Sequence, residues 1–318
     1  MDIRRRKLLK ATVAALLFGG PAAARPFGST APGDEITFLT IGDWGNPKFH
    51  KDATQVAEAM ARVADERKAQ FVLAVGDNFY PAGVSSVDDP LWQTAFEDVY
   101  SQKALDVPWH VVLGNHDYKG NVQAQIDYSG RSRRWSLPKP YYVVHQRSQD
   151  VTADFFFLDT NPMADMKWWE TVMWNDPQVE EQLQWLEREL AASTAYWKIV
   201  VGHHPVFSGG SHGNTPLLVE RLPSLFKRHN VQIYLNGHDH DLQHIQQDGT
   251  NYLTSGAAAN FRDTSSIGGT RFAQSKLGFL ATRLGRTTAT LTFIGADGNS
   301  LFETMINHGS DDAATLYP

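Results

Sequence analysis

Short apolar runs recur along the chain and alternate with longer amphipathic stretches. The runs are four to six residues long, and several are rich in β-branched or aromatic residues, which is typical of buried strands. They occupy residues 36–41, 71–75, 109–113, 155–158, 198–201 and 231–235. Apolar residues at helical spacing lie between some of them, in residues 52–68, 179–190 and 215–229. This alternation predicts an α/β protein.

The last part of the chain has a different pattern. Two apolar-rich runs within residues 278–304 flank Asp297-Gly298. An Asp-Gly pair between such runs is typical of a β-hairpin, because both residues tolerate the backbone angles of a tight turn. We therefore expect a closing hairpin in this part of the chain.

The first residues have the layout of a secretory signal peptide. A basic start at residues 4–7 precedes a mostly apolar stretch at residues 8–20 and three alanines at residues 22–24. The apolar stretch is too short to cross a bilayer, which takes about 20 residues. The pair Arg5-Arg6 resembles a twin-arginine signal, and an ordinary Sec signal is the alternative.

These features predict the organisation of the chain. We expect a signal peptide at residues 1–24, a flexible lead-in at 25–34, one catalytic domain at 35–306 and a tail at 307–318. Such a protein would be periplasmic or secreted, with no membrane contact once the signal is removed.

Composition narrows the possible chemistry. Of the 318 residues, 42% are apolar and 20% charged, which suits a globular protein with a core. The net charge of −6 gives no sign of the basic face that binds nucleic acid. The chain has no cysteine, so disulfides, thiolate metal sites and a cysteine nucleophile are excluded. Any metal must be held by nitrogen and oxygen ligands, which suit iron, manganese and zinc.

Five of the apolar runs end in a polar cluster that contains glycine. Because the carboxyl ends of strands in an open α/β sheet meet at one edge, we expect the clusters to converge. Glycines beside the polar residues let the backbone turn sharply and approach an ion closely. The clusters supply Asp43, Asp77, Tyr80, Asn115, His116, His203, His238 and His240.

These side chains are more ligands than one ion needs. A carboxylate can bridge two cations, and paired ions in phosphatases lie about 3.5–4 Å apart. Such a pair clamps a phosphoryl group and activates a bound water. The sequence therefore predicts a phosphoesterase with a two-metal centre.

The ordered motifs resemble those of a known family. They are Asp43-x-Gly45, Gly76-Asp77-x-x-Tyr80, Gly114-Asn115-His116, Val200-x-x-His203 and Gly237-His238-x-His240. This set resembles the signature of the purple acid phosphatases, a branch of the calcineurin-like metallophosphoesterases, in which Tyr80 would be the distinguishing residue. Stretches such as GDNFYPAGV and GNHDYKGNVQAQIDYS resemble the small, mammalian-type, tartrate-resistant form. The resemblance covers about residues 35–304.

The resemblance implies a fold and a set of ligands. The fold would be an α/β/β/α sandwich of two mixed sheets flanked by helices. A ferric ion would be held by Asp43, Tyr80 and His240. A divalent iron, zinc or manganese ion would be held by Asn115, His203 and His238, with Asp77 bridging the two ions.

The resemblance also implies an activity. The chain would be an acid phosphatase that hydrolyses phosphate monoesters of small molecules or phosphoproteins through a metal-bound hydroxide. His116 and His212 would steady the phosphate or protonate the leaving alkoxide. His204 and Tyr118 depart from the family, which often has tyrosine and histidine at these positions.

Two alternatives stay open at this point. The same fold could serve a phosphodiesterase or nucleotidase, or the chain could be an exported iron-binding or redox protein. The sequence leaves the physiological substrate, the divalent metal and the oligomeric state open.

Overall fold

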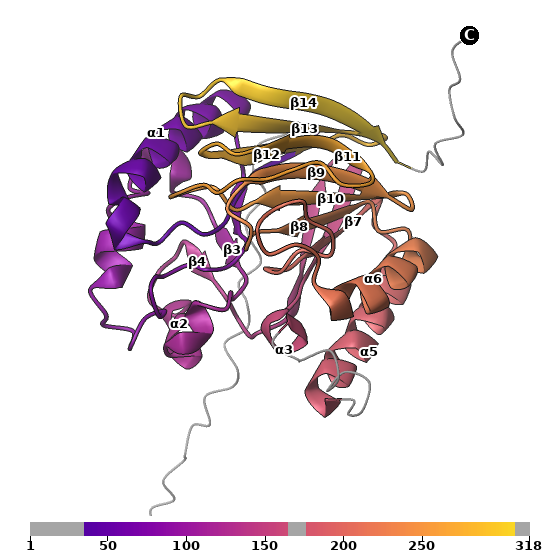
Figure 1. Cartoon of the computed structure of the whole chain (residues 1–318), viewed down its shortest axis with the longest axis horizontal. Helices are drawn as coiled ribbons and strands as arrows, with labels where there is room; N and C mark the ends of the chain where they lie inside the picture. The colour runs from indigo at the N-terminus through magenta and orange to yellow at the C-terminus, as the bar shows by residue number, and fades with distance from the viewer. Residues whose placement is uncertain (1–34, 165–175, 309–318) are drawn as a thin grey trace, which may run out of the picture. The chain divides into compact units, whose positions relative to one another are not determined.

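The computed structural model describes residues 35–164 and 176–308. In it, two seven-stranded sheets pack against each other and carry helices on their outer faces (Figure 1). The predicted signal peptide, the lead-in and residues 309–318 of the predicted tail lie outside the described residues. No helix in the described ranges is both long and apolar enough to cross a membrane.

The first sheet is parallel on one side of β1 and antiparallel on the other. Its spatial order is β14-β13-β12-β1-β2-β3-β4. Strands β1 to β4 run parallel, and β12 to β14 form an antiparallel meander that joins β1. The strands are β1 (Ile36–Ile41), β2 (Phe71–Ala74), β3 (Trp109–Val111), β4 (Trp135–Ser136), β12 (Gly278–Leu284), β13 (Thr288–Gly295) and β14 (Ser300–Asn307).

The second sheet is also mixed. Its order is β11-β9-β10-β8-β7-β6-β5, with β6, β7, β8 and β10 parallel and the outer strands antiparallel. The strands are β5 (Tyr142–Ser148), β6 (Val151–Phe157), β7 (Trp197–Val201), β8 (Ile233–Asn236), β9 (Leu242–Gln247), β10 (Thr250–Ser255) and β11 (Thr270–Gln274).

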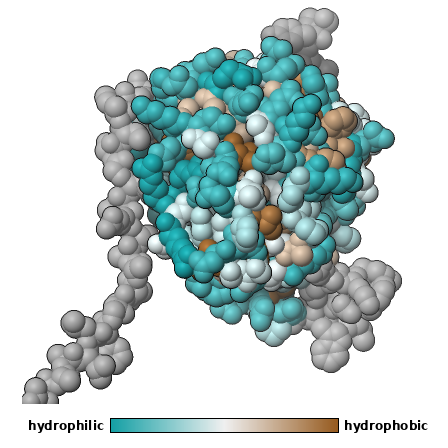
Figure 2. Space-filling model, turned by 90° about the vertical axis from the view of Figure 1, so that its left-hand side faces the viewer, coloured by the Kyte–Doolittle hydropathy of each residue, from teal (hydrophilic) through white to brown (hydrophobic). Residues whose placement is uncertain are grey.

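Helices cover the outside of both sheets. In Figure 1, α1 and α2 lie beside the first sheet, and α5 and α6 lie beside the second. Helix α1 buries one stripe of small and apolar residues, including Val56 and Met60, and its other face is exposed. The surface on that side is largely hydrophilic (Figure 2). The helices are α1 (His50–Arg67), α2 (Val122–Tyr128), α3 (Asn161–Ala164), α5 (Pro177–Ala192) and α6 (Pro216–His229), with a π-helix at Trp92–Glu97 and single turns at Pro47–Phe49, Lys103–Leu105 and Asp117–Lys119.

The central strands of the second sheet are buried on both faces, which explains their continuous apolar sequence. In β6, Phe155 and Phe157 point into the core between the sheets, whereas Phe156 packs under helices α5 and α6. Strand β7 alternates in the same way, with Ile199 and Val201 on the inner face. The period of two along a strand thus assigns each residue to one of two cores.

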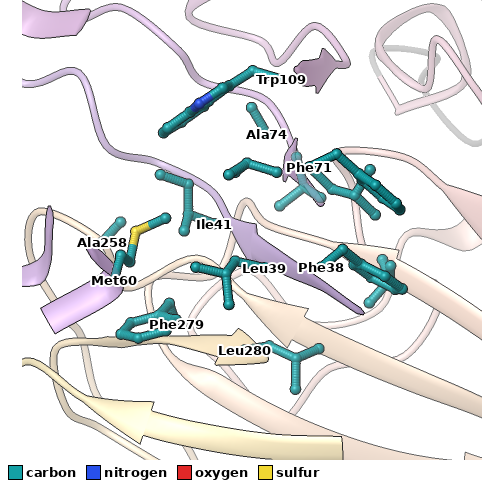
Figure 3. Close-up of a cluster of buried hydrophobic side chains, with 14 of the residues drawn as sticks. Phe38, Leu39, Ile41, Met60, Phe71, Ala74, Trp109, Ala258, Phe279 and Leu280 are labelled. Carbon is teal, nitrogen blue, oxygen red and sulfur yellow. The ribbon is translucent and has the colours of Figure 1, made fainter. Parts of the chain in front are cut away.

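The core between the sheets is tightly packed. The rings of Phe38 and Phe71 stack with centroids 5.1 Å apart, and Phe155 from the second sheet meets Phe38 edge-on at 5.3 Å. Figure 3 shows Phe38 and Phe71 in this cluster, with Met60 of α1 and Phe279 of β12 beside β1. This core fixes the strand ends that carry the polar clusters.

The predicted sandwich of two mixed sheets flanked by helices is confirmed. The six predicted strands and three predicted helices are present, with ends that differ by a few residues. The closing hairpin turns at Asp297-Gly298, but a third strand, β12, joins it. Strands β9 and β10 were missed because buried polar residues such as Gln243 and His244 interrupt their apolar pattern.

Candidate metal centre

The polar clusters lie where strands of both sheets end. Asp43 follows β1, Asp77 follows β2 and Asn115 follows β3, all in the first sheet. His203 follows β7 and His238 follows β8 in the second sheet. Hydrogen-bond distances connect these side chains across the two sheets. The sheets therefore build one site together, as the sequence predicts.

Three of these residues have an unusual backbone. Asp43, Asp77 and His238 adopt φ angles of 59°, 50° and 71°. Residues with a Cβ seldom occupy this left-handed region, although aspartate and histidine do so more often than most. Such strain costs about 1–3 kcal/mol per residue and clusters at functional sites. Here the strained backbone angles direct three side chains toward one point.

Two glycines make room for this arrangement. A Cβ on Gly114 would lie 2.2 Å from Asp77 Oδ1, and a Cβ on Gly76 would lie 2.5 Å from His203 Nδ1. Both contacts are far shorter than real Cβ contacts. Any side chain at these positions would displace a residue of the site.

One side of the site is a carboxylate and phenol cluster. The Tyr80 hydroxyl lies 2.8 Å from Asp77 Oδ2, 3.1 Å from Asp43 Oδ1 and 3.3 Å from His240 Nε2. Burial, and then the charges of Asp43 and Asp77, raise the pKa of Tyr80 well above its usual value. The phenol therefore holds its proton unless a cation replaces it.

The other side is a cluster of imidazoles and one amide. His203 Nδ1 donates to the carbonyl of Val75 at 2.9 Å, so in the neutral ring Nε2 carries a lone pair. That nitrogen lies 3.3 Å from Asn115 Oδ1 and 3.3 Å from His238 Nδ1. Asp77 Oδ1 is 3.5 Å away. These contacts bring imidazole nitrogens, an amide oxygen and a carboxylate oxygen to one point, and such a set of nitrogen and oxygen donors fits a metal ion.

The surroundings of the two histidines of this cluster shift their pKa values in opposite directions. Burial, together with the neighbouring positive charges of His203 and His204, lowers the pKa of His238. Burial would also lower the pKa of His203, but the charges of Asp77 and Asp43 outweigh it and raise that pKa. A neutral His238 is the form that can bind a metal.

His116 and His212 lie at the edge of the site. His116 Nδ1 donates to the carbonyl of Pro81 at 2.6 Å, and its ring lies 4.3 Å from that of Tyr80, centroid to centroid. The ring of His212 packs on His238 with centroids 4.2 Å apart. The structure thus brings all nine residues predicted for the site together, seven as a donor cluster and two at its rim.

Comparison with known proteins identifies the family. Residues 36–242 match the model of the calcineurin-like phosphoesterases. The chain is 39% identical to tartrate-resistant acid phosphatase type 5 of Rattus norvegicus, over 87% of this chain and 92% of the relative. It is 36% identical to purple acid phosphatase 4 of Arabidopsis thaliana, over 85% and 83%. The chain belongs to the calcineurin-like phosphoesterases, and within them to the purple acid phosphatases.

A solved structure shows the same fold. The structure described as GAP50, the anchor in the inner membrane complex of Plasmodium, superposes with a TM-score of 0.77 and is 25% identical. It covers 87% of this chain, and the match spans 90% of GAP50. As a member of the phosphoesterase family, the chain is a hydrolase.

Two further residues, His204 and Tyr118, lie close to the proposed site. His204 is buried, with its ring 4.5 Å from that of His238, and its Nδ1 is 2.9 Å from Thr160 Oγ1. It therefore shares a possible metal-binding group with His203 and His238. The Tyr118 hydroxyl donates to Asp159 Oδ2. Burial raises the pKa of Asp159 to about 6.

Two aspartates of the phosphoesterase site were missed by the sequence analysis. Asp117 is fully buried and accepts hydrogen bonds from the backbone of Asn78 and Gly114, so it ties the loop after β2 to the loop after β3. Asp239 is equally buried and accepts from the backbone N–H of His212 at 2.8 Å. Both lie beside residues that were already predicted for the site, so their separate role could not be recognised from the sequence.

Proposed function

We propose that this phosphoesterase is an acid phosphatase that hydrolyses phosphate monoesters at a binuclear Fe(III)–M(II) centre. The observation that carries the proposal is the pair of donor sets that share Asp77, whose Oδ2 meets Tyr80 while its Oδ1 faces His203. A carboxylate in this position can bridge two cations. Its negative charge, with that of Asp43, offsets their mutual repulsion.

Each donor set suits one ion. Asp43 and Tyr80 offer hard oxygen ligands for the ferric ion and His240 adds an imidazole nitrogen, whereas Asn115, His203 and His238 suit divalent iron, zinc or manganese. When bound, the two ions polarise the phosphoryl group and activate a water molecule for attack on phosphorus. The fully buried Asp43 and His203 exclude bulk water from the inner face of the centre.

His116 is proposed to steady the phosphate. Its Nδ1 holds a proton through the bond to Pro81, which leaves Nε2, 4.0 Å from Asp77 Oδ2, to accept a second proton. The protonated ring donates from Nε2 to a phosphoryl oxygen. Its side chain is 26% exposed, so it faces the side from which substrate enters.

His212 is proposed to protonate the leaving alkoxide. Its backbone is fixed by Asp239, and its Nε2 accepts from Arg262 at 2.8 Å. In the neutral ring the proton therefore sits on Nδ1, and Arg262 must release Nε2 before the ring can take up a second proton. A histidine in this place supports an acidic pH optimum, because its protonated form is the acid.

The proposal is tested by comparing p-nitrophenyl phosphate with bis(p-nitrophenyl) phosphate on metal-analysed protein. We expect the monoester to be the preferred substrate, with two metals per chain including iron. Preference for the diester would favour the phosphodiesterase alternative. Bound iron that is released or cycles in redox state, without turnover of either ester, would favour the iron-binding alternative.

The identity of the ferric ligand has its own test. A ferric ion would ionise Tyr80 and give a phenolate-to-iron charge-transfer band, so the protein should be violet to pink. Tyr80→Phe should abolish the band. A colourless protein that is replete with iron would contradict the assignment.

We also propose that the mature protein begins near Arg25 outside the cytoplasm, in the periplasm or secreted. The basic, apolar and small-residue segments at residues 4–24 support this. Intact mass of the native protein measures the start, and a chain that keeps Met1 would contradict the proposal. Replacement of Arg5 and Arg6 by lysine should block export by the twin-arginine route and spare a Sec signal.

A further inference from the structure

Arg262 places a positive charge at the rim of the proposed active site. Its backbone N–H donates to the carbonyl of His240 at 2.8 Å, which fixes its Cα beside a proposed metal ligand. Its side chain is exposed and donates from Nη1 to His212 Nε2 at 2.8 Å. Among residues 35–164 and 176–308, no carboxylate forms an ion pair with this guanidinium.

The position of Arg262 relative to the metal centre follows from His212. One face of the His212 ring packs on His238, and its Nε2 meets Arg262. The guanidinium is therefore separated from the proposed divalent site by a single imidazole. Because His212 is proposed to act on the leaving alkoxide, Arg262 lies next to the part of the substrate that departs.

The chemistry of the guanidinium indicates what it binds. Arginine has five N–H donors in a planar fork that matches a carboxylate or a phosphate. The imidazole accepts one hydrogen bond and does not neutralise the charge. An anionic group on the substrate would neutralise this charge and could accept two parallel hydrogen bonds from the fork, neither of which the imidazole does, so it would compete well for this side chain.

We propose that Arg262 selects phosphate monoesters whose leaving alcohol carries a second anionic group, a carboxylate or a further phosphate. This inference rests on the proposed phosphatase function. The phosphate that is hydrolysed meets the metal ligands and His116, whereas the second anion meets Arg262. Arg262 is thus a specificity-determining residue and not a metal ligand.

A matched pair of substrates tests the proposal. Glycerol 3-phosphate and 3-phosphoglycerate contain the same primary ester, but the second has a carboxylate in place of a CH₂OH group. We expect the metal-loaded protein to have the higher kcat/KM for 3-phosphoglycerate. Arg262→Met should lower the ratio of the two kcat/KM values by about 10–100-fold, as expected for loss of a charged hydrogen bond.

Two controls separate charge from general disturbance of the loop. Phe261→Ala changes the neighbouring side chain, which is 51% exposed, and should leave the ratio unchanged. Arg262→Lys keeps the charge without the fork and should retain part of the selectivity. Metal content and the visible band should be the same in all variants, because none removes a ligand.

The outcomes are distinct. A ratio that is unchanged in Arg262→Met would overturn the proposal. If both kcat/KM values also fall by the same factor, Arg262 acts on the scissile phosphate instead. Failure of the unmodified protein to hydrolyse p-nitrophenyl phosphate would instead refute the proposed function. In case Arg262→Met does not fold, the unmodified protein provides a second test. Its ratio should fall at high salt, because exposed charge pairs are screened, and a salt-independent ratio would contradict the proposal.

Discussion

The floor and the rim of the site are built in different ways. The floor consists of strand-end residues, among which Asp43 and His203 are 0% exposed and Asp77 is 2% exposed. The rim includes His212 and Arg262, which come from the loops after β7 and β10 and are exposed. The floor is part of the protein core, and the rim lies on its surface.

This difference separates two tasks. The floor is held by strained backbones and by Asp117, whose carboxylate accepts from the backbone of both Asn78 and Gly114, so its geometry is fixed before any ligand arrives. In the rim, Asp239 holds the backbone of His212. One hydrogen bond joins the His212 ring to Arg262. We infer that the floor binds the metals and that the rim chooses the substrate.

The largest effect should follow a change in the floor. Asp77→Asn removes the anion that is proposed to bridge the two cations. If the cations are lost, the attacking water is no longer activated and its pKa returns toward the bulk value of about 15.7. We expect fewer than two metals per chain and a fall in kcat of at least about 10⁴-fold. Metal analysis and a p-nitrophenyl phosphate assay measure both. Asp65→Asn, on a side chain that is 77% exposed, is the matched control and should change neither. Full metal content in Asp77→Asn would contradict the bridging role.

A change in the rim should reduce the rate and spare the metals. His212→Ala removes the proposed general acid, which typically costs about 10²–10⁴-fold. Alkyl phosphates should lose most, because their alkoxides need a proton, and p-nitrophenyl phosphate should lose less. Steady-state kinetics on both esters, with metal analysis, measure this. An equal loss on both esters would make His212 a phosphate-positioning residue, and a loss of metal would make it a ligand.

The same contrast governs what the sequence could predict. The residues of the floor could be predicted from the sequence because they follow apolar strands and lie close to a glycine, as in Gly76-Asp77 and Gly114-Asn115. The fold could be predicted for a related reason, since buried strands have continuous apolar runs. Arg262 gave no signal, because its contact with His212 joins residues 50 positions apart. Asp239 was hidden between His238 and His240, and only the structure shows which side chain it holds.

The rim's dependence on Asp239 predicts an intermediate effect. Asp239→Ala removes the acceptor for the His212 N–H and for Ser208 Oγ, so the loop should lose its fixed position. Residues that orient a site in this way typically contribute about 10–100-fold. Activity on alkyl phosphates should fall by that factor. The double variant with His212→Ala should be no slower than His212→Ala alone, because both changes act through one group. Additive losses would show that Asp239 acts independently of His212.

The smallest effect concerns a histidine beneath the floor. His110 lies in β3, fully buried, with its ring centroid 5.6 Å from that of Phe71 and 5.9 Å from that of Phe157. Burial lowers its pKa to about 4 from the usual 6.5.

The sign of the resulting pH dependence follows from where the proton binds. Below pH 6.5 the unfolded chain gains a proton that the folded chain resists until about pH 4, so stability present at neutral pH is lost as the solution becomes acidic. Between pH 7 and pH 5 this loss amounts to about 2 kcal/mol of unfolding free energy. In His110→Leu the difference between the unfolding free energies at these two pH values should shrink by that amount, as measured by denaturant titration. An unchanged difference would mean that His110 does not resist protonation in the fold. The proposed enzyme works in acid, so His110 lowers the stability of the core under the conditions that the active site favours.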